Sequence, residues 1–168
     1  METLKVFFSF TLLVISGFML GEVAFSFALV DPDDLIEDVK STSVVKVNNV
    51  TVDVILATTP SDQSKGLAVK DSMNENEGML FVFKNPQKHS FWMKDMKFPI
   101  DIIWADSAGK IVHIEKNLQP CIFLLPCTSY SPISDSLYVL EVVSNFTNKF
   151  DVKIGDQILS DSISMDKT

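Results

Sequence analysis

Hydrophobic and polar positions divide the chain into stretches of different character. Residues 6–30 are almost continuously apolar, apart from Glu22 and a few small hydroxyl side chains. Residues 31–42 are acidic and polar with little to bury, which predicts a linker. From 43 to 162 short apolar runs alternate with polar turns, as is typical of a folded domain, and 163–168 form a short tail.

The apolar segment predicts export by one of two routes. As a helix rising ~1.5 Å per residue, residues 6–30 are long enough to cross the ~30 Å hydrocarbon layer of a membrane. Lys5 precedes the segment and Asp31 follows it, so the lysine side is expected to stay in the cytoplasm. Alternatively, residues 6–20 are the core of a signal peptide that is cleaved near Ser26-Phe27-Ala28. Either route predicts a domain that is membrane-anchored and faces outside the cytoplasm, or secreted.

Alternation along the first part of the domain predicts a hairpin followed by a helix. Residues 44–57 read as two strands joined at Asn48-Asn49, because asparagine tolerates the positive φ of a tight turn. Thr59-Pro60 is a typical helix start, with proline in the first turn, and the helix should continue through SKGLAV.

The remainder of the domain reads mainly as strands. Residues 107–110 predict a hairpin turn, residues 144–150 predict one or two helical turns, and a last short strand follows near Ile158. The pattern predicts a mostly β fold, a compact sandwich or barrel with one or two short helices, preceded by the N-terminal hydrophobic helix. The expected strands of this part are 78–83, 89–94, 100–106, 111–116 and 138–143.

Charge and cysteine content narrow the partners. The net charge is −8 and all 14 basic side chains are lysines, so nucleic acid is not an expected partner. Cys121 and Cys127 are too few for a thiolate zinc site and predict one disulfide in an oxidising compartment, with two buried free thiols as the alternative. Asn49-Val50-Thr51 and Asn145-Phe146-Thr147 are glycosylation sequons.

Two carboxylates fall on strand faces that otherwise look buried. Asp101 shares its face with Ile103 and Ala105, and Glu141 shares its face with Val139. A buried carboxylate must find hydrogen-bond donors or stay protonated. The two groups are therefore either an acid/base pair of a hydrolase or structural acceptors of backbone hydrogen bonds.

Metal and nucleophile chemistry have weaker support. His89, Met93 and Met96 are soft ligands that suit copper(I), but Met93 and Met96 point to opposite faces of a regular strand unless a bulge intervenes. His113 lies on a mixed face and suits a structural role. No glycine-rich phosphate loop, nucleophile elbow or zinc-protease motif is present, so we expect no cofactor.

A local cluster of lysines suggests where a ligand binds. It is either a strand edge protected by charge or a basic pocket that holds an anionic group over Trp92 or Trp104. Asp95 is the only acid among the lysines, which are Lys84, Lys88, Lys94 and Lys97.

Several motifs together resemble one family. They run over roughly residues 44–160 in the order Lys65-Gly66-Leu67, Gly78 to Phe83, Phe91-Trp92-Met93-Lys94, Pro99 to Ile103, Tyr138 to Val142 and Gly155-Asp156. This chain resembles the family catalogued as domain of unknown function 192, which implies a small, mostly β, often exported or membrane-tethered domain with no established activity. It departs from the family pattern at Ala68, Lys70, Asp95-Met96 and Ser144-Asn145.

These observations favour a binding or accessory module without catalysis, tethered to the membrane through its N-terminal segment. Its partner is expected to be a small ligand or a protein, bound through Trp92, Lys94, Asp101 and Glu141. The alternatives are a hydrolase that uses Asp101 and Glu141 and, less favoured, a copper-binding protein.

Overall fold

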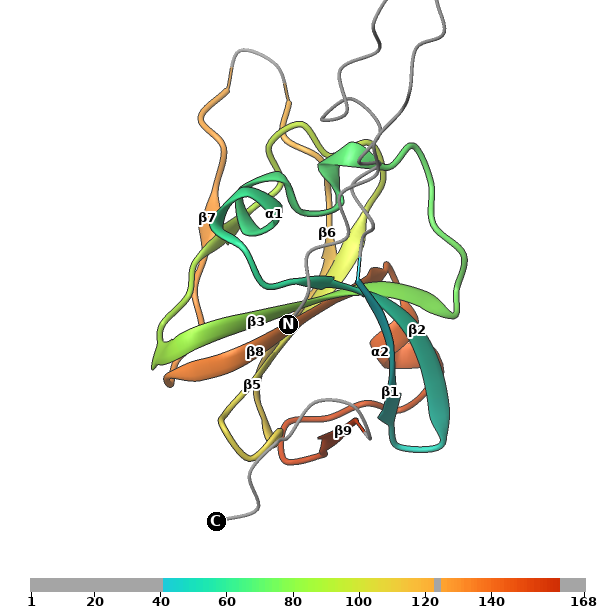
Figure 1. The fold of residues 1–168 in the computed structure, drawn as a ribbon. Coiled ribbons are helices and arrows are strands. Elements are labelled where there is room, and N and C mark those ends of the chain that lie inside the picture. Colours follow the sequence, from blue (N-terminus) through green and yellow to red (C-terminus); the bar gives the residue numbers. More distant parts are fainter. Residues whose placement is uncertain (1–40, 123–124, 161–168) are drawn as a thin grey trace, which may run out of the picture. The chain divides into compact units, whose positions relative to one another are not determined.

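The computed structural model describes residues 41–122 and 125–160 (Figure 1). The predicted N-terminal helix, nearly all of the acidic linker and the tail lie outside these residues. Within them, no helix is both long enough and apolar enough to span a membrane.

Seven strands form one curled sheet that resembles half of a barrel (Figure 1). Their order is β6-β5-β8-β3-β2-β1-β9, and every neighbouring pair is antiparallel except β2 and β3. The strands are β1 (Thr42–Val47), β2 (Val50–Ala57), β3 (Glu77–Gln87), β5 (Ile100–Ala105), β6 (Ile111–Leu118), β8 (Ser136–Val143) and β9 (Ile158–Leu159).

The first hairpin forms where the sequence predicts it. Val47 pairs with Val50, and Asn48 has a φ of 55°, the left-handed conformation that asparagine tolerates. Val45 and Val47 of β1 are buried while the residues between and before them are exposed, as period-two alternation requires.

The connection from β2 to β3 contains the predicted helix. Parallel neighbours cannot be joined by a tight hairpin, so the chain crosses over through α1 (Pro60–Lys65) and the 3₁₀ helix η2 (Gly66–Val69). Thr59 caps α1, because its hydroxyl oxygen accepts a hydrogen bond from the Asp62 N–H at 3.2 Å.

Each face of the sheet covers its own apolar cluster. The cluster beside the short helix α2 (Phe146–Lys149) contains Val45, Val52, Leu80, Ile103, Leu140 and Phe146 among its buried members. The cluster beneath η2, which we call the η2-side cluster, contains Ala57, Leu67, Met79, Phe81, Met93, Ile100, Ile102, Trp104, Leu118 and Val139.

The sandwich or barrel expectation is correct only at the level of a mostly β fold. The second sheet is a ribbon of two short strands, β4 (Phe91–Trp92) and β7 (Ser129–Tyr130), so the expected strand 89–94 is much shorter than predicted. The main sheet does not close along its length: its edges meet near one end, where the Ile111 N–H donates to the Asp156 carbonyl and the Ile158 N–H to the Gly109 carbonyl, both at 2.8 Å.

Candidate functional site

Asp101 of β5 is fully buried and has four hydrogen-bond donors. Its Oδ1 accepts from the backbone N–H groups of Asn117 (2.8 Å) and Asn145 (3.2 Å). Its Oδ2 accepts from the backbone N–H of Thr147 (2.9 Å) and from the hydroxyl of the same residue (2.6 Å). Two donors on each oxygen fill the acceptor capacity of a carboxylate. Asp101 therefore links β5 to the end of β6 and to the start of α2.

Glu141 of β8 is in the opposite situation. It is only 4% exposed, and its Oε2 has no hydrogen-bond partner in the part of the chain that the structure describes. The Leu67 backbone N–H donates to the carboxyl group, but burial outweighs this contact and raises the pKa of Glu141 to about 8. The side chain is therefore mostly neutral at pH 7.

The two carboxyl groups lie on opposite faces of the sheet. Asp101 pairs with Val142, and Glu141 pairs with Ile102, so the pairing register directs the two side chains away from each other. An acid/base pair must face one reacting group from both sides. The geometry does not bring Asp101 and Glu141 together in that way.

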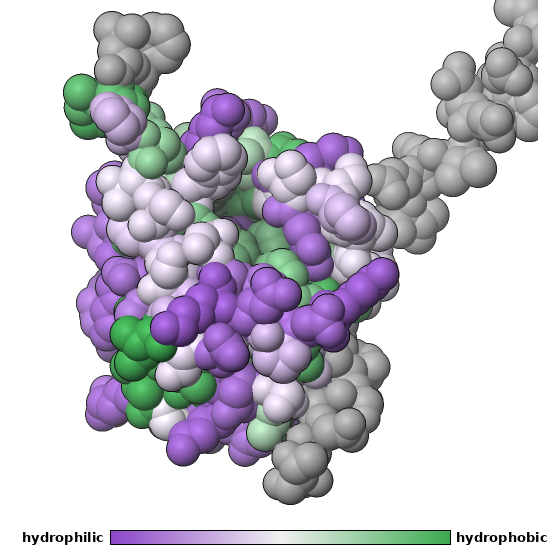
Figure 2. Space-filling view, turned by 90° about the vertical axis from the view of Figure 1, so that its left-hand side faces the viewer, coloured by the Kyte–Doolittle hydropathy of each residue, from purple (hydrophilic) through white to green (hydrophobic). Residues whose placement is uncertain are grey.

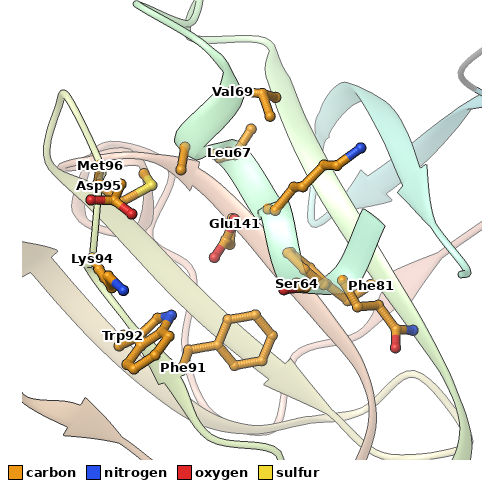
Figure 3. Close-up of a pocket in the computed structure, with 14 residues that line it drawn as sticks. Ser64, Leu67, Val69, Phe81, Phe91, Trp92, Lys94, Asp95, Met96 and Glu141 are labelled. Carbon is orange, nitrogen blue, oxygen red and sulfur yellow. The ribbon is translucent and has the colours of Figure 1, made fainter. Parts of the chain in front are cut away.

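A cavity of about 390 Å³ lies between η2 and the segment 91–96, and Glu141 is directed into it. In Figure 3, Glu141 lies at the centre of the labelled side chains, with Leu67 on one side and Lys94 and Phe91 on others. Figure 2 shows the α1 side of the domain, where apolar residues line a hollow between hydrophilic ones. The lining residues are Gln63 to Val69, Phe81, Phe91, Trp92, Lys94, Asp95, Met96 and Glu141.

Aromatic rings and a lysine form one wall of this cavity. The rings of Phe81 and Phe91 meet edge to face with centroids 4.8 Å apart. Trp92 is 55% exposed, and the Lys94 Nζ lies 5.4 Å from the centroid of its ring. Trp104 is the other tryptophan predicted to contact an anionic ligand. It is buried in the η2-side cluster and donates its indole N–H to the His89 carbonyl at 2.8 Å.

Only one of the four clustered lysines contributes to the cavity. Lys84 and Lys88 are exposed and do not line it, and Lys97 forms an ion pair with Asp71 at 2.5 Å. Lys94 lines the cavity and is joined there by Lys65. The sequence does not mark Lys65 as a site residue, because a lysine in the last turn of a short helix is also favoured by the helix dipole.

The backbone of Gly66 passes close to the buried carboxyl group. Its φ is 53°, which disfavours other residues, and a Cβ there would lie 3.8 Å from Glu141 Oε2 and 3.5 Å from Phe81 Cζ. The Lys65-Gly66-Leu67 motif was the signal in the sequence, but its contact with Glu141 spans some 75 residues and could not be inferred from local pattern.

The structure gives no support to the copper hypothesis. The His89 ring stacks on Phe83 with centroids 3.5 Å apart, and its Nε2 lies 3.1 Å from the Asn85 carbonyl. Met93 is buried beside the Cys121 loop, whereas Met96 lines the Glu141 cavity. No group of three or more His, Cys, Asp or Glu side chains that could hold a metal occurs within 41–122 and 125–160. His113 pairs with Glu115 at 3.1 Å.

The predicted disulfide is present and borders the cavity wall. Cys121 and Cys127 are bonded, with their Cα atoms 5.4 Å apart. The Cys121 N–H donates to the Met93 carbonyl at 3.1 Å, and β7, which follows the disulfide, pairs with β4. The disulfide loop therefore supports the segment that carries Trp92 and Lys94.

Both sequon asparagines, Asn49 and Asn145, are exposed. The second sequon overlaps the start of α2, and its Thr147 hydroxyl is bound to Asp101.

Comparison with known proteins yields structural relatives and one family. No curated protein matches the chain. A structure from Sinorhizobium meliloti 1021, described as a "putative transcription regulator", is 24% identical, with a TM-score of 0.67 over 74% of this chain and 97% of that chain. A protein of unknown function from Novosphingobium aromaticivorans DSM 12444 is 25% identical, with a TM-score of 0.62 over 71% and 84%. The pattern of the family described as DUF192, "Uncharacterized ACR", matches residues 43–160.

Proposed function

The chain belongs to the DUF192 family, and on this premise we propose that its domain is a non-catalytic module that binds a small organic molecule in the Glu141 cavity. The family carries no assigned activity, so the proposal depends on the site itself. As part of it, we propose that the domain is exported and either tethered by residues 6–30 or secreted after their cleavage. The Cys121–Cys127 disulfide suits an oxidising compartment.

The observation that carries the proposal is the unpartnered Oε2 of Glu141. Leaving a buried polar atom without a hydrogen bond costs about 1–3 kcal/mol, so such an atom is ordinarily satisfied or serves a purpose. The side chain of Glu141 lines a cavity whose volume falls within the range of small-molecule sites, although Oε2 itself is buried. A small rotation of the carboxyl group would turn this oxygen toward the cavity, where a ligand or a bound water would supply the missing partner.

Support for binding, as opposed to catalysis, comes from the surrounding groups. Among the described residues, Glu141 has no second titratable side chain within hydrogen-bond distance, and the one hydroxyl side chain of the lining, Ser64, has no base beside it there. Apolar walls with a few polar groups are typical of a site that holds a ligand and fixes its orientation.

The test is a binding screen on the full-length protein. We expect at least one class among small carboxylates, amines, amides and sugars to bind, as detected by ligand-observed NMR. A Trp92→Ala/Lys94→Ala variant should lose at least about tenfold in affinity, because it removes an aromatic wall and a charge. Lys84→Ala, an exposed lysine outside the cavity, is the matched control.

Two results would overturn the proposal. One is that no class binds to the wild-type protein. The other is that the double variant binds as tightly as the wild type while circular dichroism shows it to be folded.

A further inference from the structure

The polar groups of the Glu141 cavity are mostly hydrogen-bond donors. Lys65, Trp92 and Lys94 line the cavity, and the polar groups of these side chains, two ammonium groups and an indole N–H, are donors only. The amide nitrogen of Gln63 is already engaged, since it donates to the carbonyls of Ala57 and Val82 at 3.2 and 3.0 Å. A cavity supplied with donors favours a ligand rich in acceptors.

Glu141 adds a further donor at the bottom of the cavity. The Leu67 N–H donates to the carboxyl group and Oε2 has no partner, so we assign Oε1 as the acceptor. In the neutral form the proton then resides best on Oε2, and a small rotation of the carboxyl group directs it into the cavity that Glu141 lines. A protonated carboxyl group held in this way donates a short, strong hydrogen bond to an oxygen anion.

The charges of the lining leave an excess of one positive charge when Glu141 is neutral. Lys65 and Lys94 are cationic and Asp95 is anionic. Neither lysine forms an ion pair or hydrogen bond with another side chain within residues 41–122 and 125–160, although Lys94 lies over the Trp92 ring. A monoanion would balance this charge. A phosphate monoester carries up to two negative charges, so it would leave one of them unbalanced. Phosphate is also held best by arginine, which this chain does not contain.

The remaining surface of the cavity is apolar. Leu67, Phe81 and Phe91 line its inner part, and the two phenylalanine rings are packed against one another. A ligand that fills the cavity must therefore carry an apolar body as well as its charged group.

We infer that the cavity binds a small organic monocarboxylate with an aromatic or branched apolar body. Its carboxylate lies between the Lys94 ammonium group and the carboxyl group of Glu141, and its body packs against Phe81, Phe91 and Leu67. This inference rests on the proposed function and names the ligand class of the same site.

Three probes with one shared body test the charge of the ligand. Isothermal titration calorimetry on the full-length protein compares 3-phenylpropionate, 3-phenylpropionamide and 3-phenylpropylamine at about pH 6, where Glu141 is neutral. We expect the carboxylate to bind at least about tenfold more tightly than the amide, as charged hydrogen bonds imply. Lys94→Met should remove this preference, and Lys84→Met should retain it.

A second variant tests the role of the Glu141 proton. The wild-type affinity for 3-phenylpropionate should fall at least about tenfold between about pH 6 and pH 9, because ionised Glu141 repels the ligand. Glu141→Gln keeps a donor at this position, so at about pH 6 it should bind 3-phenylpropionate with an affinity comparable to that of the wild type. Its affinity should not decrease between about pH 6 and pH 9. The other charged residues that line the cavity, Lys65, Lys94 and Asp95, are common to both proteins, so their contribution cancels in the comparison.

The outcomes separate the two proposals. Tightest binding of the amine, equal binding of carboxylate and amide, or the same pH dependence in Glu141→Gln would each overturn the carboxylate assignment. If none of the three probes binds while another class from the screen does, the proposed function stands and the assignment fails. If no probe of any class binds, both fail.

Discussion

Two buried carboxyl groups on neighbouring strands have opposite surroundings. Asp101 receives four donors, whereas Glu141 receives one and is left with an unpartnered oxygen. The sequence predicts correctly that both side chains are buried. It could not show that they lie on different faces of the sheet. A shift of one residue in the pairing of β5 and β8 would move either side chain to the other face.

Glu141 should make folding stability depend on pH. Its pKa is about 8 in the folded protein against an ordinary value of 4.5, so the folded state keeps a proton that the unfolded state loses in between. The free energy of unfolding should therefore fall as pH rises from about 4.5 to about 8 and then level off, by on the order of 5 kcal/mol at most.

Urea unfolding across this range checks the expectation. Glu141→Gln should lack this part of the decline, because an amide does not titrate. Glu75→Gln, at an exposed glutamate, should retain it. An equal slope in the wild type and in Glu141→Gln would show that the buried carboxyl group is not its source.

At the scale of elements, local signals predict the helix and the first hairpin well. Thr59 and Pro60 define the start of α1, and Asn48 defines the turn, because each acts on its immediate neighbours. The strand expected at 89–94 is reduced to Phe91–Trp92. The chain turns away after it, since Met93 contacts the Cys121 loop and Asp95 has a φ of 60°. These contacts come from residues some 30 positions later and leave no local pattern.

Asp101 joins three elements, so its loss should act on all of them. Its partners are Asn117 near the end of β6, Asn145 at the N-cap of α2 and Thr147 within α2. Asp101→Asn should lower the free energy of unfolding by about 3 kcal/mol, because the amide –NH₂ faces donors that a carboxylate satisfied. Asp135→Asn, at an exposed residue, is the control for chemical denaturation. A change below about 0.5 kcal/mol would contradict the role assigned to Asp101.

At the scale of the whole domain, period-two alternation predicts a mostly β fold but not its degree of closure. Closure depends on whether the two edge strands meet, and here residues 109–111 contact 155–158 at one end only. These segments are about 45 residues apart in the sequence, so the alternation within each strand does not predict that they meet. The two faces of the sheet, each with its own cluster, explain why so many strands read as apolar runs.

The net charge of −8 predicts how the protein behaves toward nucleic acid. We expect the full-length protein not to retard duplex DNA in a gel at about 50 mM salt, because its acidic surface repels phosphates and it contains no arginine. Retardation that persists against competitor DNA of unrelated sequence would contradict this expectation.

The Cys121–Cys127 bond gives the protein a sensitivity to thiol reductants that reaches beyond the loop it closes. Once it is opened, the strand pairing of β4 with β7 and the contact of Cys121 with Met93 lose their anchor. Trp92 and Lys94 would then be held less firmly above Glu141. In surroundings rich in glutathione we therefore expect the protein to keep its main sheet but to bind a ligand with lower affinity.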